Sequence, residues 1–138
     1  MKKLIYVFLG LSLGCANPKY LDDTHYLPQG SDSISCAQRI ANICTDIIWN
    51  QGPSSQGESR FHIQFDSELP ESAVLEVILW MPSMNHGSAP VTVKRISNSS
   101  FEASKVFFIM PGDWEVRILL KDSSGSILGR HTLEFILP

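Results

Sequence analysis

The chain has 138 residues, with 11 Lys and Arg against 14 Asp and Glu, so its formal net charge is −3 at pH 7. This acidic balance, without any run of basic residues, argues against nucleic acid as a partner. The length suits one domain with its own hydrophobic core, and a second domain is not expected.

The first residues, MKKLIYVFLGLSLGC, have the pattern of an export signal. Two lysines precede an apolar run over residues 4–13, far shorter than the roughly 20 residues that span a bilayer. Gly14-Cys15 after this run resembles the lipobox of bacterial lipoproteins. The resemblance implies a signal peptide over residues 1–14 and a lipid-anchored mature N-terminus at Cys15, and Ala16 favours the outer membrane over the inner. Ordinary signal cleavage after Ala16, which would discard Cys15, is the alternative.

The next segment, residues 15–34, contains Pro, Gly, Asp and Ser without periodicity. This composition predicts a flexible tether, so residues 35–138 are expected to form the folded domain. Loss of the two signal-peptide lysines would leave 9 Lys and Arg against 14 Asp and Glu, a net charge of −5.

Cys36 and Cys44 lie in the stretch CAQRIANIC, at the start of this domain. In an oxidising compartment they are expected to form a disulfide, worth about 2 to 3 kcal/mol in the chain-entropy model. They lack the two-residue spacing of redox and zinc motifs. A continuous helix would hold the two thiols too far apart, so the disulfide predicts a bent segment.

From Cys44 onward, short apolar stretches alternate with turn signals, and no stretch has a helix-length pattern. RFHIQFD, AVLEVILWM and WEVRILLKD alternate apolar and polar residues, which is typical of strands with one buried face. The turn SSGS joins the last of these to ILGRHTLEFIL as a hairpin. Together with CTDIIWN, VTVKR and FEASKVFFIM, they predict an all-β fold, an immunoglobulin-like antiparallel β-sandwich of about seven strands. A small barrel with another strand order stays open.

Two Met-Pro steps, Met81-Pro82 and Met110-Pro111, each end a predicted strand, because proline lacks the N–H that a ladder requires. One strand separates these two, so both should run in the same direction. Both corners are therefore predicted at one end of the sandwich, together with the QGPSSQGE loop and the C-terminus.

Soft donor atoms gather at this predicted end. Thioether sulfur and neutral imidazole suit Cu(I) better than Zn, Mg or Ca, so we expect Met84, His86 and Met110 to bind copper, with Met81 as a further candidate ligand and Trp114 as a shield. The alternative is structural, since methionine commonly fills gaps beside aromatic rings. Under that alternative the loops pack or dock a protein partner of the envelope, without any metal.

The stretch MPSMNHGSAPVTV, followed by FFIMPGDWEVRILL, resembles the YtkA-like domain family and the related FixH-like proteins. The matching positions are Met81, Pro82, Met84, His86 and Gly87 in the first motif and Met110, Pro111, Gly112 and Trp114 in the second. The resemblance covers roughly residues 45–137 and implies an exported or membrane-attached immunoglobulin-like domain. FixH-like relatives are linked to assembly of copper-containing respiratory oxidases. The resemblance therefore implies copper handling or delivery in the cell envelope, with such an oxidase or another envelope protein as partner.

The remaining chemistry in the chain is sparse. His62 lies on the exposed face of its predicted strand, where an ordinary polar strand position is favoured over a further metal ligand. His131 and His25 are given no role. The sequence has no nucleophile elbow, and no Ser or Cys has an evident paired base, so enzyme activity is not expected.

Overall fold

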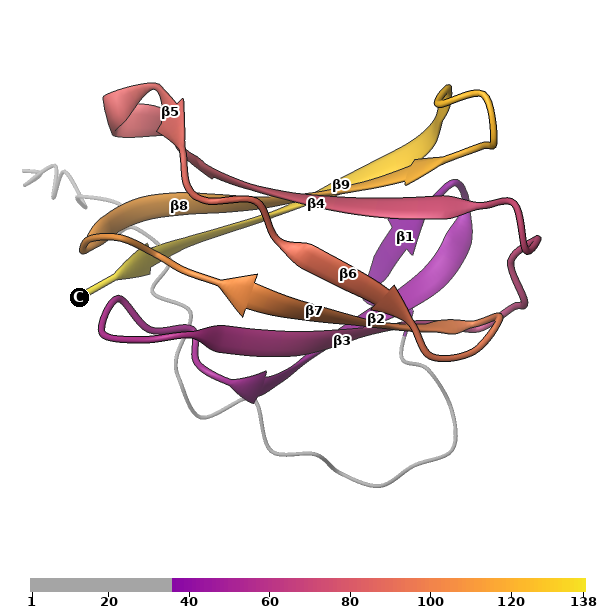
Figure 1. The fold of residues 1–138 in the computed structure, drawn as a ribbon, viewed down its shortest axis with the longest axis horizontal. Helices are drawn as coiled ribbons and strands as arrows, with labels where there is room; N and C mark the ends of the chain where they lie inside the picture. The colour runs from indigo at the N-terminus through magenta and orange to yellow at the C-terminus, as the bar shows by residue number, and fades with distance from the viewer. Residues whose placement is uncertain (1–35) are drawn as a thin grey trace, which may run out of the picture.

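The computed structural model describes residues 36–138, so the predicted signal peptide, Cys15 and the tether lie outside the described residues. The described residues form a β-sandwich of two antiparallel sheets (Figure 1). The strands are β1 (Gln38–Ile40), β2 (Ile43–Gln51), β3 (Ser59–Phe65), β4 (Val74–Met81), β5 (His86–Gly87), β6 (Thr92–Arg95), β7 (Ser100–Val106), β8 (Gly112–Lys121) and β9 (Ile127–Leu137).

The order of the strands is that of an immunoglobulin-type fold. One sheet has the order β1-β2-β3-β7-β6 and the other β5-β4-β8-β9. Seven of these strands, β2, β3, β4, β6, β7, β8 and β9, are those the sequence predicts, and they divide between the sheets as the strands of an immunoglobulin domain do. The predicted sandwich is therefore confirmed, with two very short strands, β1 and β5, added to it.

Alternating side chains build the core between the sheets. In β3 the apolar positions Phe61, Ile63 and Phe65 are buried, whereas His62 and Gln64 between them are half-buried on the outer face. Strands β4 and β8 alternate in the same way. The period of two in the sequence is therefore the period of burial in the structure.

Aromatic rings fill the core towards one end of the sandwich. The ring centroids of Trp49 and Phe61 are 4.8 Å apart, and Phe108 lies 5.3 Å from Trp114 and 5.4 Å from Phe135. These tilted and edge-on arrangements suit the ring quadrupoles. The cluster draws its members from β2, β3, β8, β9 and the connection that precedes β8, so it joins both sheets.

The predicted disulfide and bend are both present at the start of the domain. Cys36 and Cys44 are bonded, with their Cα atoms 4.8 Å apart. Cys44 lies in β2, which forms a hairpin with β1, and the turn residues Ala41 and Asn42 both have positive φ, at 52° and 65°. Positive φ at both central residues is characteristic of type I′ turns, one of the two common two-residue hairpin turns.

The predicted strand FEASKVFFIM is too long at its C-terminal end, because β7 ends at Val106 rather than at Met110. Lys105 has a φ of 57°, which extended backbone does not adopt, and its N–H donates to the Glu58 carboxylate at 2.8 Å. This kink makes a bulge in the ladder with β3, in which Val106, opposite Ser59, is the last paired residue of β7. Phe107 and Ile109 therefore lie in an irregular connection and are exposed at 39% and 54%.

Candidate functional site

Both Met-Pro corners lie at the same end of the sandwich, on the left in Figure 1. There the turn between β4 and β5, the connection between β7 and β8, the loop between β2 and β3 and the C-terminus come together (Figure 1). We call this end, comprising residues 81–87 and 107–114, the methionine pole. The hairpin turn between β8 and β9 lies at the opposite end.

The first corner is a tight reversal of the chain. Strand β4 ends at Met81, and Pro82 begins a short 3₁₀ helix, η2 (Pro82–Met84). Asn85 then adopts a left-handed conformation, with φ 53°, and its N–H donates to the Pro82 carbonyl at 3.2 Å. Because the turn projects away from the core, Met84 is 55% exposed.

The chain returns from this turn alongside β4. In the β4–β5 pair, His86 lies directly opposite Met81, and Gly87 lies opposite Trp80. Directly opposite residues of an antiparallel pair point to the same face of a sheet. Met81 is buried on the inner face, so the half-buried imidazole of His86 lies on the side where the Met81 thioether lies.

A hydrogen bond sets the tautomer of His86. Its Nδ1 lies 3.0 Å from the carbonyl oxygen of Gly87. A carbonyl only accepts, so Nδ1 carries the hydrogen, and Nε2 keeps its lone pair in the neutral ring. Metal-binding histidines commonly have this arrangement, in which one ring nitrogen donates to the backbone and the other is left to bind the ion.

The second corner is held by Trp114. Its indole Nε1–H donates to the backbone carbonyl of Met110 at 2.9 Å, and the ring is only 1% exposed and packs edge-on against Phe108. A tyrosine at the equivalent place in immunoglobulin domains, near the start of the same strand, makes a similar bond to the backbone upstream. Trp114 therefore lies in the core and fixes this corner, and its role as a shield over a metal stays a prediction.

The two corners touch each other at two points. The backbone N–H of Ser83 donates to the Asp113 carboxylate at 3.2 Å, and the terminal methyl of Met81 lies against Gly112. A Cβ at Gly112 would lie 2.5 Å from Met81 Cε, and the φ of +135° at Gly112 is also one that residues with side chains rarely adopt. The two sequence motifs, although 30 residues apart, are therefore one packed unit.

Asp113 is the acidic group of this unit, and sequence reasoning assigned it no role. Hydrogen bonding, chiefly from the Ser83 side chain, holds the pKa of the Asp113 carboxyl below its usual value. The carboxylate is therefore ionised at neutral pH and already has hydrogen-bond donors from the opposite corner. In the sequence, this contact between the two corners is indicated only by an acidic residue directly after Pro111-Gly112.

The predicted metal ligands differ in exposure. Met84 is the most exposed, at 55%, His86 and Met110 are half-buried, and Met81 is 3% exposed within the core. The structure pairs Met81 with His86 directly, whereas Met84 and Met110 reach the same pole from η2 and from the β7–β8 connection. No cluster of three or more His, Cys, Asp and Glu side chains that could hold a metal is found among residues 36–138. The side-chain donors at this pole are thioethers, one imidazole and the Asp113 carboxylate, which already accepts a hydrogen bond from Ser83.

The other two described histidines lie away from the methionine pole. His62 is on the outer face of the other sheet, where its Nε2 lies 3.2 Å from the Glu102 carboxylate. His131 is half-buried on β9, and burial lowers the pKa of its imidazole.

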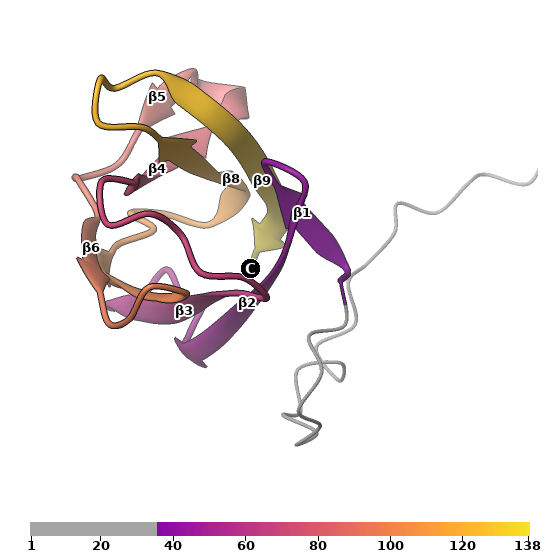
Figure 2. The same ribbon diagram turned by 90° about the vertical axis from the view of Figure 1, so that its right-hand side faces the viewer.

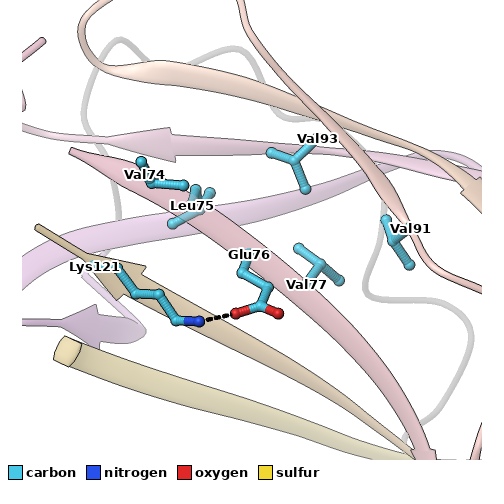
Figure 3. A pocket seen from close by; sticks show the side chains of 7 residues that line it. All are labelled: Val74, Leu75, Glu76, Val77, Val91, Val93 and Lys121. Atoms are coloured by element: carbon cyan, nitrogen blue, oxygen red, sulfur yellow. Dashed lines mark hydrogen bonds and ion pairs between the residues drawn. The ribbon is translucent and has the colours of Figure 1, made fainter. Parts of the chain in front are cut away.

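An open groove runs between β4 and β6, where the edges of the two sheets face each other (Figure 3). Valines dominate its lining, and an ion pair between Lys121 and Glu76 lies at one side (Figure 3). Apart from these two charges, which neutralise each other, the groove offers no group for chemistry. It is lined by Val74, Leu75, Glu76, Val77, Val91, Val93 and Lys121.

The fold and the pole define the described part of the chain as an all-β, immunoglobulin-like sandwich with a methionine-rich end. No protein-family model matches the chain, and no curated protein is similar to it. Membership of the YtkA-like family therefore stays a prediction from the two motifs. Among the described residues, no helix is long and apolar enough to cross a bilayer.

Proposed function

We propose that this protein binds Cu(I) at the methionine pole and acts in copper handling or delivery in the cell envelope. The pairing of His86 with Met81 carries the proposal, together with the hydrogen bond that leaves Nε2 of His86 as a free donor atom. An imidazole in the ligand tautomer thus lies beside a thioether, at the pole where two further thioethers arrive.

The donor set fits Cu(I) better than harder ions. Zinc sites usually include thiolates or several imidazoles, and Ca²⁺ and Mg²⁺ require oxygen ligands. The one carboxylate of the packed unit, Asp113, accepts a hydrogen bond from Ser83 instead. Thioether sulfur and neutral imidazole are uncharged ligands that suit a soft ion. Met84, His86 and Met110 would therefore bind Cu(I) without a carboxylate ligand, with Met81 as a further ligand.

Each proposed ligand has a distinct part in such a site. Met84, exposed on the turn, meets an incoming ion first, and His86 supplies the one nitrogen donor. Met81 and Gly112 pack at the base of the pole and keep the two corners together. The bound Cu(I) would then be transferred to a partner protein that requires copper.

Three further features support an envelope role. The first residues have the pattern of an export signal with a lipobox-like Gly14-Cys15, which would anchor the protein by lipid, with the outer membrane favoured. The Cys36–Cys44 disulfide suits an oxidising compartment. The resemblance to YtkA-like and FixH-like proteins supports a copper-containing oxidase or another envelope protein as the recipient.

Anaerobic titration of Cu(I) against a strong colorimetric chelator tests this proposal. The wild type should compete for the ion, and Met84→Ala combined with His86→Ala should weaken its affinity about tenfold or more, because two of the few donors are lost. His62→Ala is the matched control, since it removes an imidazole from the far sheet and should leave the affinity unchanged. Absence of competition by the wild type, or equal affinity in the double variant, would contradict the proposal.

A second candidate function is a docking module that uses the same pole without metal. The observation that favours it is the exposure of Met84, Phe107 and Ile109, at 55%, 39% and 54%. Apolar side chains gathered at a loop end are typical of a protein contact. Ile109→Asp separates the two functions. It should abolish a protein contact detected by cross-linking in the envelope while leaving Cu(I) affinity unchanged.

A further inference from the structure

Strand β9 is the last strand of its sheet, and its outer edge forms no ladder with another strand within residues 36–138. It is 11 residues long, the longest strand described, and pairs with β8 along almost its whole length. An edge of this kind presents a row of N–H and C=O groups that another strand can pair with. Natural proteins usually cover or blunt such an edge.

The outer face of β9 carries two charged side chains, Arg130 and Glu134. Arg130 and Glu134 are exposed, and neither forms an ion pair in the described part of the chain. Glu134 lies directly opposite Glu115 of β8, whose carboxylate is already bound by Arg117 at 2.6 Å. Like charges directly opposite each other destabilise a sheet, so a cation on the free side of Glu134 would relieve this repulsion.

Exposed apolar side chains flank these charges on the same strand. Leu128 is 52% exposed, and Ile136, at 74%, is the most exposed large apolar residue described. They stand at equal distances from Thr132, one towards each end of the strand. Arg130 and Glu134 are also equally spaced about Thr132. If this face is laid against a copy of itself in the opposite direction, each cation meets an anion and each apolar side chain meets an apolar one.

We propose that the protein forms a two-fold symmetric dimer in which β9 pairs antiparallel with β9 of a second copy, centred on Thr132. In this register Arg130 faces Glu134 of the other copy, Leu128 faces Ile136, and each contact occurs twice. A two-fold interface requires a surface that is complementary to itself, and this strand has one. Moving the centre by one residue would place Arg130 opposite Ile136 or opposite Thr132 and lose both kinds of match.

The β1–β2 hairpin lies beside β9 but forms no ladder with it. The β1–β2 turn lies against the inner side of Gly129, where a Cβ would be 2.2 Å from the backbone N of Ala41, and it leaves the outer-face side chains exposed. Figure 2 shows β1 beside β9 at this side of the sandwich. A bulge between Leu120 and Lys121 of β8 and the facing residues of β9 ends the regular ladder near Leu128, so the Leu128 contact lies at the rim.

The dimer would join two four-stranded sheets into one sheet of eight strands. Because the paired strands run in opposite directions, the two methionine poles would lie at opposite ends of the assembly. An edge-to-edge contact is small, so we expect a dissociation constant roughly in the micromolar range. The interface is separate from the proposed copper ligands, and the two proposals can fail independently.

Charge reversal tests the register. The exported protein, purified from cells that express the full chain, should sediment as a dimer at micromolar concentration. Arg130→Glu and Glu134→Arg should each weaken dimerisation about tenfold or more, because each creates two like-charge pairs. The double reversal should restore the dimer, since it exchanges the partners. A monomeric wild type, or a double variant no better than the single ones, would overturn the proposal.

A cross-link tests the symmetry axis independently of charge. Thr132→Cys places two thiols opposite each other at the centre, within the Cα separation that disulfides accept. Mild oxidation should give a covalent dimer that reductant reverses. Thr92→Cys is the matched control, because Thr92 is an exposed threonine on β6, the edge strand of the other sheet. Cross-linking of Thr92→Cys as readily as Thr132→Cys would contradict an interface at β9.

Discussion

Replacement of Gly112 by alanine tests whether the two corners of the methionine pole are one packed unit. The added methyl would lie 2.5 Å from the terminal carbon of Met81, and the backbone φ of +135° would have to be kept by a residue that rarely adopts it. Backbone strain of this kind costs about 1 to 3 kcal/mol. Overpacking against a buried side chain costs about 1 to 3 kcal/mol more.

We therefore expect Gly112→Ala to lower the free energy of unfolding by about 3 kcal/mol, with both contributions present. Urea denaturation followed by tryptophan fluorescence measures this loss. For a domain of this size, it should shift the midpoint by roughly 1 to 2 M urea. Small domains have only about 5 to 15 kcal/mol of stability, so the variant stays folded and measurable.

Gly125→Ala is the control that separates the two contributions. Gly125 also has a positive φ, +85°, but a Cβ there would meet nothing within 4 Å. It should therefore show the backbone cost alone. The packing contribution should in turn disappear when Met81→Val removes the methyl that Gly112 contacts.

Two results would refute this reasoning. One is a cost for Gly112→Ala no greater than that of Gly125→Ala. The other is a cost that stays the same in the Met81→Val background, since the clash cannot survive removal of the atom that causes it.

Three further predictions concern pH and redox state. The folded-state pKa of Asp113 lies below its usual 3.8, so the stability that its carboxylate contributes is present above pH 3.8 and is lost as pH falls through the lower folded pKa. When the urea midpoint is plotted against pH, Asp113→Asn should therefore make the decrease at acidic pH shallower. For His131, burial lowers the folded-state pKa below 6.5, so stability should fall as pH drops from 6.5 towards that lower pKa. In His131→Gln, the free energy of unfolding measured by chemical denaturation should depend less steeply on pH across this range. Reduction of the Cys36–Cys44 disulfide should lower the free energy of unfolding by about 2 to 3 kcal/mol, and the Cys36→Ser, Cys44→Ser double variant should show no response to reductant in the same denaturation assay.

The sequence predicted the fold because burial in a sandwich has the same period as the strand. Phe61, Ile63 and Phe65 alternate in the chain and are all buried in β3. The short strands escaped detection, since β5 has two residues, His86 and Gly87, and a period cannot be read from two positions. The disulfide was predicted from compartment chemistry and spacing rather than from any strand pattern.

Contacts at the methionine pole were less predictable. Strand direction placed both corners at one end, but nothing in the sequence pairs His86 with Met81, because that depends on the left-handed Asn85. The end of β7 was also missed, because the apolar run over residues 106–110 looks like a continuation of the strand, and the pattern does not show the left-handed backbone of Lys105. These are properties of single dihedral angles, which hydrophobic patterns do not encode.

The backbone and the side chain of Met110 have different roles at the corner that Trp114 holds. Trp114 takes the main-chain carbonyl of Met110, and any amino acid would supply that atom. The fold of this corner therefore depends on the indole of Trp114 but does not depend on the sulfur of Met110. Packing against the core asks only for an apolar side chain there, which leucine would serve equally well. If natural variants retain sulfur at this position in preference to leucine, the constraint has to come from something that the folded chain alone does not contain.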